Sequence, residues 1–215
     1  MSSAAAGGRE RVLAQIRQSL GRATSVAASP AIVPLAGNGP RPAYDGDLVE
    51  HFIAKMQQKA ATVERLDTLA EVGPAVARFV AAMRAAPRVR VSRALDGIAW
   101  PPGLEVMHGA SVREDPTSVT PCFAAVAESG GIVTLSGPDT PSTLNFVPDN
   151  HVVIVRAAQV LRHFEDVWSL WRATDRPLPR TLNIISGPSR TADIEQTIQL
   201  GAHGPRRLHI LLCTA

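Results

Sequence analysis

Six short runs of apolar residues, separated by longer polar or amphipathic segments, most constrain the fold of this chain. Most of the runs are near-continuous instead of alternating with polar residues, which is typical of strands covered on both faces. They lie at residues 89–91, 104–107, 131–135, 151–155, 182–185 and 208–212. Segments with helical periodicity lie between several of them, at residues 119–127, 158–171 and 192–200. Strands that alternate with helices predict a layered α/β fold with a largely parallel sheet flanked by helices.

The N-terminal part of the sequence differs from the rest. Residues 9–20 carry four apolar side chains at helical spacing, and residues 21–42 are rich in Ala, Ser, Pro and Gly, as linkers are. We therefore expect an N-terminal helical arm with its linker over residues 1–46 and one α/β domain over residues 47–215. The arm packs on its own domain, or it binds a partner or a second copy of the chain; the sequence leaves these open.

The domain is expected to open with a helix that follows Asp47. A short strand at residues 62–66 and a second helix at residues 68–86 come next. Pro74 lies near the start of that second helix, where proline is tolerated because the first turn needs no backbone N–H bond.

Composition excludes several classes of function. The chain has 22 basic and 19 acidic residues among 215, without a block of Lys or Arg, so nucleic acid is not expected as a partner. Its aromatic content of 4% also argues against a platform on which bases stack.

The two cysteines, Cys122 and Cys213, are too few and too far apart for a four-ligand iron–sulfur or zinc site. We therefore expect no metal site and no cofactor in this chain. Residues 1–10 lack the pattern of a signal peptide, and no apolar run approaches the ~20 residues that span a bilayer. A cytoplasmic protein without a membrane span is the expectation.

A polar segment after the run at residues 182–185 is the first candidate site. It contains Gly187, Ser189, Arg190, Thr191 and Asp193 and is expected to begin a helix. Backbone N–H groups at such a helix start, with an Arg and two hydroxyls, suit a carboxylate or phosphate group. Helix capping by Ser or Thr and the acidic first turn explain part of the segment without a ligand. Arg190 is what capping leaves unexplained.

A rigid turn with His203 and Gly204 follows the same predicted helix. Capping does not account for this turn either, so we include both residues in the candidate anion site.

Glu128, Ser129 and Gly130 form a second candidate, at an expected junction between a helix and a strand. An acid at a helix C-terminus opposes the macrodipole, and a carboxylate held in an unfavourable place can act as a base or nucleophile. Glu128 is therefore the candidate catalytic residue, although many such residues are simply solvated.

Ser142 and Asn145 form a third candidate, in the loop between two expected strands. Loops at strand ends commonly line the ligand crevice of an α/β sheet. His151, which begins the next strand, is expected to be a structural hydrogen-bonding group, because no pair of histidines has the spacing of metal ligands.

Three segments of the sequence together resemble the LUD-domain family. The resemblance rests on Ala127-Glu128-Ser129-Gly130, on residues 187–195, and on residues 201–205 with the apolar run that follows. The family's usual Ala-Glu-Thr-Gly-Thr reads here with Gly131 at its last position, which removes a hydroxyl. The resemblance implies a fold related to the NagB, ribose-5-phosphate isomerase and CoA-transferase group. It also implies a place in a three-component system that oxidises L-lactate to pyruvate, in which the other two components carry the iron–sulfur clusters.

Two hypotheses follow. In the first, the chain is a component of the lactate oxidation system that lacks redox clusters. It would bind a small carboxylate or phosphate-bearing ligand, or organise the iron–sulfur subunits. In the second, it is a free-standing isomerase or acyl-transfer enzyme that uses Glu128. The sequence does not decide whether the chain catalyses a step.

Overall fold

A computed structural model describes residues 3–21, 41–194 and 197–214 in two units, residues 1–41 and 42–215. The first unit contains helix α1 (Ser3–Ser19), which confirms the expected N-terminal helix. Its apolar residues Val12, Ile16 and Leu20 are exposed. Most of the predicted linker lies outside the described residues.

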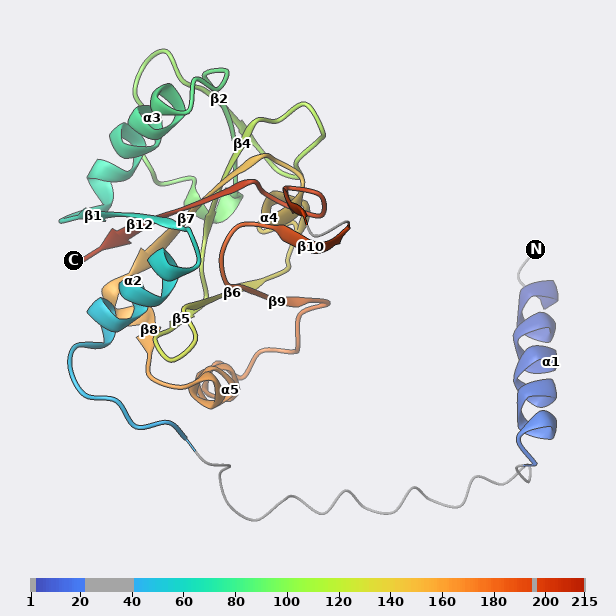
Figure 1. Ribbon diagram of the computed structural model, residues 1–215. Helices are drawn as coiled ribbons and strands as arrows, with labels where there is room; N and C mark the ends of the chain where they lie inside the picture. The colour runs from blue at the N-terminus through green and yellow to red at the C-terminus, as the bar shows by residue number, and fades with distance from the viewer. Residues whose placement is uncertain (1–2, 22–40, 195–196, 215) are drawn as a thin grey trace. The chain divides into compact units, whose positions relative to one another are not determined.

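A six-stranded sheet forms the centre of the second unit, and every pair of neighbouring strands in it is parallel. Its order is β1-β12-β7-β4-β2-β3 (Figure 1). The strands are β1 (Thr62–Leu66), β12 (Arg207–Cys213), β7 (Asn150–Arg156), β4 (Thr117–Pro121), β2 (Arg88–Val91) and β3 (Glu105–His108). This sheet confirms the α/β fold expected from the near-continuous apolar runs.

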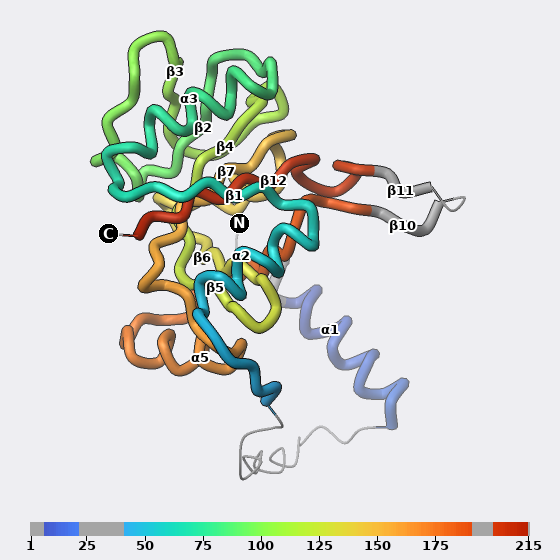
Figure 2. Tube along the Cα trace, turned by 60° about the vertical axis from the view of Figure 1, so that its left-hand side comes forward, coloured from blue at the N-terminus to red at the C-terminus, as the bar shows by residue number. Residues whose placement is uncertain are grey.

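Helices cover this sheet on opposite faces (Figures 1 and 2). Helix α3 (Val72–Ala82) packs Val76 and Phe79 against one face, in a core that includes Val152 of β7. Helix α2 (Leu48–Gln58) packs Phe52 and Met56 into a second core on the other face. Side chains alternate along a strand, so one apolar strand such as β7 serves both cores.

A second sheet of four strands lies beside α2, and its inner side chains belong to the same core. Its order is β8-β5-β6-β9, with strands β8 (Val160–Leu161), β5 (Ala124–Val126), β6 (Gly131–Leu135) and β9 (Leu182–Ile185). Helix α5 (Phe164–Ala173) covers the other face of this sheet through Val167. The second unit therefore has two packed sheets with helices outside them.

Two expected helices are wrong in whole or in part. Residues 119–127 form the end of β4 and then β5, because an apolar run buried on both faces looks alike in a strand and in a helix. The helix expected at residues 158–171 begins only at Phe164, after the short strand β8.

The helix expected at residues 192–200 is also wrong. Strands β10 (Arg190–Ile194) and β11 (Thr197–Leu200) form an antiparallel hairpin instead, with Arg190 opposite Leu200. The segment contains several β-branched residues, which favour strands over helices.

Short helical turns connect the strands. They are η1 (Leu69–Glu71), η2 (Arg93–Leu95), α4 (Thr143–Phe146) and η3 (Ala157–Gln159). The first of them precedes α3, so the helix expected at residues 68–86 is divided at its start and ends at Ala82. Pro74 is the third residue of α3, in its first turn as expected.

Asp47 begins α2 as a helix cap. Its carboxylate accepts hydrogen bonds from the backbone N–H groups of Val49 at 2.8 Å and Glu50 at 3.0 Å. Such a bond satisfies N–H groups that have no partner inside the helix. The expected start of the domain helix is therefore confirmed at this residue.

A buried ion pair joins strand β2 to the segment that precedes β4. Arg90 of β2 donates from Nε and Nη2 to the two carboxylate oxygens of Asp115, at 2.9 and 3.2 Å. The backbone N–H of Val112 donates to the same carboxylate at 2.9 Å. Burial alone would raise the pKa of Asp115, but these hydrogen bonds outweigh it and hold the pKa below its usual value.

Within the described ranges, no helix combines the length and the apolar character needed to cross a lipid bilayer.

Candidate functional site

The order of the large sheet indicates where a ligand is expected. From β2 the chain moves outward to β3, whereas from β4 it moves the other way, through β7 to β12. In open α/β sheets, ligands bind at the carboxyl ends of strands where this direction reverses. The carboxyl ends of β2 and β4 are therefore the expected location.

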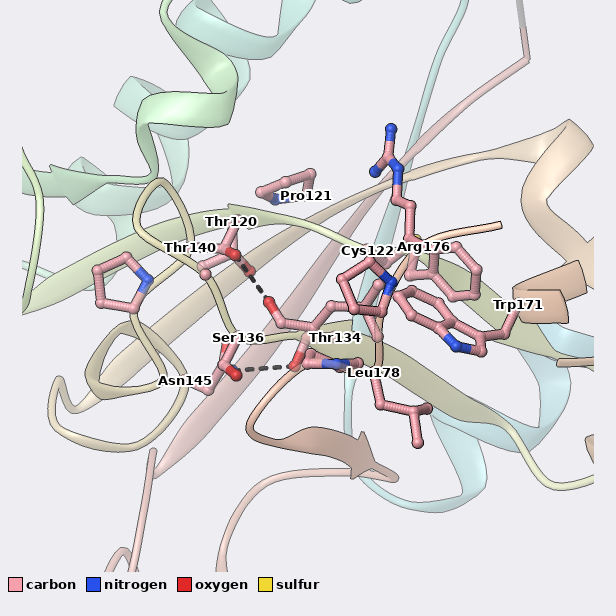
Figure 3. A pocket seen from close by; sticks show the side chains of 16 residues that line it. Thr120, Pro121, Cys122, Thr134, Ser136, Thr140, Asn145, Trp171, Arg176 and Leu178 are labelled. Atoms are coloured by element: carbon pink, nitrogen blue, oxygen red, sulfur yellow. Dashed lines mark hydrogen bonds between the residues drawn. The ribbon is translucent and has the colours of Figure 1, made fainter. Parts of the chain in front are cut away.

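A cavity of about 490 Å³ opens at the carboxyl end of β4, where it is bounded by the small sheet and by residues 176–179. The loop that follows β6 forms another wall. Ser92, directly after β2, fixes this loop because its hydroxyl and the N–H of Arg93 both donate to the carbonyl of Asp139, at 2.6 and 3.0 Å. The cavity thus lies at the expected edge of the sheet (Figure 3).

Polar side chains buried between the two sheets line the inner part of the cavity. Thr120, Thr134 and Asn145 are each no more than 5% exposed. Asn145 Nδ2 donates to Thr134 Oγ1 at 2.9 Å, and Thr120 Oγ1 lies 2.8 Å from His151 Nε2. Burial lowers the pKa of His151 to about 3, so this imidazole is neutral at physiological pH.

Apolar and cationic side chains line the outer part. Phe123 and Trp171 meet edge to face, with ring centroids 5.7 Å apart. Leu178 and Arg176 are exposed, and Figure 3 shows them with Trp171 on one side of the cavity. Arg176 gives this wall a positive charge that suits a carboxylate.

Cys122 also lines the cavity, but its thiol is poorly suited to nucleophilic chemistry. Burial raises its pKa to about 12, and the thiolate is the reactive form. Its Sγ lies 3.4 Å from Gln159 Oε1, and Gln159 Nε2 donates to the Cys122 carbonyl at 2.9 Å. These contacts give Cys122 a structural role at the end of β4.

A second hollow, of about 560 Å³, lies at the same edge of the sheet and shares Pro121 with the first. Apolar side chains dominate its lining, and its polar side chains are Arg156 and Gln159. Gln159 is engaged, since its Oε1 accepts the backbone N–H of Arg156 at 2.9 Å. The first cavity, with its buried hydroxyls and amide, is therefore the stronger candidate.

Among the described residues, no group of three or more His, Cys, Asp or Glu side chains could hold a metal ion.

The structure corrects the setting of Glu128. This residue lies in the turn between β5 and β6 and not at a helix C-terminus. Its Oε2 accepts the backbone N–H of Phe164 at 3.3 Å and lies 3.2 Å from His163 Nδ1. A carboxylate at the N-terminus of α5 is favoured by the helix dipole, so the strain that suggested a catalytic role is absent at this residue.

Glu128→Gln should therefore lower the free energy of unfolding by about 0.3–1 kcal/mol, because it removes an anion from the start of α5. Denaturant unfolding measures the loss, which should shrink in 1 M salt, where charges are screened within about 3 Å. The variant should bind cavity ligands as the wild type does. A covalent acyl adduct on Glu128 that is formed with a thioester and is absent in the Gln variant would contradict this interpretation.

Ser129, Gly130 and Gly187 gather around Lys59, which the sequence analysis missed. Lys59 Nζ donates to the Ser129 carbonyl and to Ser186 Oγ, both at 2.5 Å. The positive φ angles of Gly130 and Gly187 let both turns approach α2. A Cβ on Gly187 would lie 2.9 Å from the Lys59 carbonyl oxygen. These residues fasten the end of α2 to the small sheet.

The remaining residues of the predicted anion site lie at the hairpin. Ser189 closes its base, donating its N–H to the Pro205 carbonyl at 2.8 Å and accepting the Gly201 N–H at 3.0 Å. Arg190 is exposed and begins strand β10, where a helix N-terminus was expected. Thr191 and Asp193 belong to the same strand, and their side chains lie outside the described residues.

His203 and Gly204 line a different hollow, of about 630 Å³, together with Asp115 and Asp149. Asp149 directly precedes β7, so this hollow lies at the amino edge of the sheet, opposite to the cavity at the end of β4. The predicted residues thus fall in separate places instead of forming one anion site.

Of the third candidate pair, Asn145 lines the cavity. Ser142, three residues earlier, is not part of the lining, and its Oγ lies 3.0 Å from Thr181 Oγ1. The sequence analysis missed Thr120 and Thr134. For Thr134 the signal was a hydroxyl inside an otherwise apolar strand, where a side chain without a ligand or partner is costly to bury. Thr120 gave no such signal, because its strand β4 also contains Thr117 and Ser118.

Comparison with known proteins gives consistent matches. A family model described as the LUD domain matches residues 116–213. The lactate utilization protein C of an Exiguobacterium species is 32% identical over 111 residues, which are 50% of this chain and 48% of that protein. An uncharacterized protein of Neisseria meningitidis is 36% identical over 86 residues, 40% of this chain and 37% of that protein. The matches thus span less than half the length of these two relatives.

A crystal structure of a DUF162 family protein from Deinococcus radiodurans shares the fold. It is 22% identical, with a TM-score of 0.60, over 80% of this chain and 99% of that one. This likeness concerns the fold alone. The family match covers the cavity: every residue that lines it lies within residues 116–213, the part of the chain that matches the LUD domain.

Proposed function

We propose that this protein is a component of lactate utilization that binds a small carboxylate, lactate or pyruvate, in the cavity at the end of β4. The observation that carries the proposal is the pairing of buried hydroxyl and amide groups with the cationic rim residue Arg176 in one cavity. Small-molecule sites combine an apolar wall with a few such polar groups. The name of the Exiguobacterium relative, lactate utilization protein C, supports the metabolic setting.

The iron–sulfur chemistry of such a system is proposed to reside in partner subunits. The sequence contains two cysteines, both buried, one at the end of β4 and one at the end of β12. A four-cysteine cluster needs more thiolates than this chain has. The protein would then supply binding or organisation to an oxidation that its partners carry out.

Two measurements on the full chain test this proposal. Saturating lactate or pyruvate should raise the melting temperature, because a ligand that binds only the folded state stabilises it. Arg176→Ala should weaken this stabilisation, whereas Arg180→Ala, a charge-matched change outside the cavity lining, should not. Affinity purification from a host that grows on lactate should also recover proteins with iron–sulfur absorbance. Absence of both the stabilisation and the association would refute the proposal.

A further inference from the structure

We propose that Thr120 and Thr134 form a pair of hydroxyl donors that select ligands with only acceptor oxygens, so that the cavity prefers a 2-oxo acid to the corresponding 2-hydroxy acid. The inference rests on the proposed function, since it assigns the substrate class of the same cavity. It depends on whether the proton of each hydroxyl has an acceptor within the protein.

The Thr134 hydroxyl is engaged as an acceptor. Asn145 Nδ2 donates to its oxygen at 2.9 Å, and both side chains are buried. A hydroxyl carries one proton besides its lone pairs, and among the described residues no acceptor takes the proton of Thr134. Because Thr134 lines the cavity, a ligand oxygen is the partner available to that proton.

The same reasoning applies to Thr120, through His151. This imidazole is fully buried and neutral, so one of its two nitrogens carries a proton. Within the described part of the chain, Nδ1 has no partner, whereas Nε2 lies 2.8 Å from Thr120 Oγ1. A buried N–H without an acceptor is rarer in proteins than a buried acceptor without a donor. The proton is therefore assigned to Nε2, which donates to Thr120. The Thr120 proton is then left for the cavity, which Thr120 lines and where a ligand or water oxygen can accept it.

Other hydroxyls around the cavity differ from this pair. Thr140 Oγ1 donates to the Leu135 carbonyl at 2.7 Å, so its proton is already used. Ser136 Oγ accepts the Thr181 N–H at 2.9 Å and keeps its proton, but Ser136 is only half-buried and can exchange its partner for water. The buried donors are thus Thr120 and Thr134.

A site that presents buried donors discriminates between closely related acids. The ketone and carboxylate of pyruvate offer only acceptor oxygens. The hydroxyl of lactate brings a proton of its own, which the two threonine donors do not satisfy and which competes with them for the same contacts. Leaving one buried donor unpaired should weaken binding about tenfold.

Titration calorimetry on the full chain tests this assignment with pyruvate, lactate and propionate, which lacks the second oxygen function. We expect pyruvate to bind about tenfold more tightly than lactate, and propionate most weakly. Thr120→Val and Thr134→Val should each weaken pyruvate binding about tenfold and reduce the preference over lactate. Thr117→Val, which removes a buried hydroxyl from the same strand as Thr120 but outside the cavity lining, is the matched control, and its affinity should stay within about twofold of the wild type.

Thr120→Ser and Thr134→Ser, which keep the hydroxyl, should retain the preference for pyruvate, and circular dichroism verifies that each variant is folded. If either Val variant fails to fold, the pyruvate-to-lactate ratio of the wild type decides. Equal affinity for the two acids, or Val variants that bind as the control does, would overturn this inference and leave the proposed function standing. A wild-type protein that binds none of the three acids would overturn this inference together with the ligand-binding part of the proposed function.

Discussion

Asp115→Ala should lower the free energy of unfolding by about 3–5 kcal/mol, because it leaves the Arg90 guanidinium buried without its counter-ion. Both side chains are almost fully buried, and their contact is bidentate. Removing one partner of such a pair costs far more than removing a surface charge, since the remaining ion cannot be solvated. Denaturant unfolding measures this difference in the free energy of unfolding, provided that both proteins have the same slope of free energy against denaturant concentration.

Two variants isolate the cause. Glu114→Ala removes the same charge one residue earlier, from an exposed side chain, and should change stability by less than about 0.5 kcal/mol. The double variant Arg90→Met with Asp115→Leu removes both ions and should recover most of the loss, because apolar pairs of similar volume replace buried ion pairs well. A single Asp115 variant as stable as the wild type would show that the pair is open to solvent.

The pH dependence of this effect has a definite sign. The pKa of Asp115 is held below its usual value in the folded protein. Its stabilising contribution is therefore complete above the unfolded pKa of about 3.9, and it is lost as the pH falls through the lower folded value. The gap in stability between the wild type and Asp115→Asn should consequently narrow below about pH 4.

Gly73→Ala should destabilise the protein by about 1–3 kcal/mol, although alanine normally stabilises a helix relative to glycine. Gly73 is buried in α3, and a Cβ there would lie 2.1 Å from the Ala99 carbonyl oxygen and 3.3 Å from Pro101 Cδ. A backbone carbonyl cannot rotate away as a flexible side chain does. The segment around Ala99 must then move, or α3 must shift away from the sheet.

Gly97→Ala is the matched control in the same segment. A Cβ at that position meets no atom within 4 Å, so the change should be neutral within about 0.5 kcal/mol. Helix propensity alone predicts that Gly73→Ala is more stable than Gly97→Ala. Thermal and denaturant unfolding should show the reverse order. A Gly73→Ala protein more stable than the wild type would mean that the close approach of residue 99 does not exist in solution.

The large sheet could be predicted from sequence because its strands are buried on both faces. Residues 151–155 and 208–212 read as near-continuous apolar runs, each with one histidine, and form the buried strands β7 and β12. The small sheet was harder, because one of its faces meets the main core and the other meets α5. Its strand β5 is then as continuously apolar as a buried helix, and three residues carry no period that distinguishes the two.

The candidate site was predictable only in part. Asn145 was found because it follows an apolar run in a polar loop. Thr120 and Thr134 were not, because each looks like an ordinary strand residue until the two sheets are packed face to face. The signature-like segment at residues 187–195 misled for the opposite reason, since hydroxyls and acids that resemble a helix cap also occur in a hairpin. Residue types alone do not report which surfaces come together.

The place of β12 in the large sheet has a consequence for how the protein reaches its native state. This strand follows all the others in sequence, yet it lies between β1 and β7, and Thr62 is paired with His209. During synthesis β1 therefore has no sheet neighbour until the last strand has emerged. Pairings between segments so distant in sequence slow folding. The early chain must wait with β1 unpaired, which is the interval in which a chaperone would have most to protect.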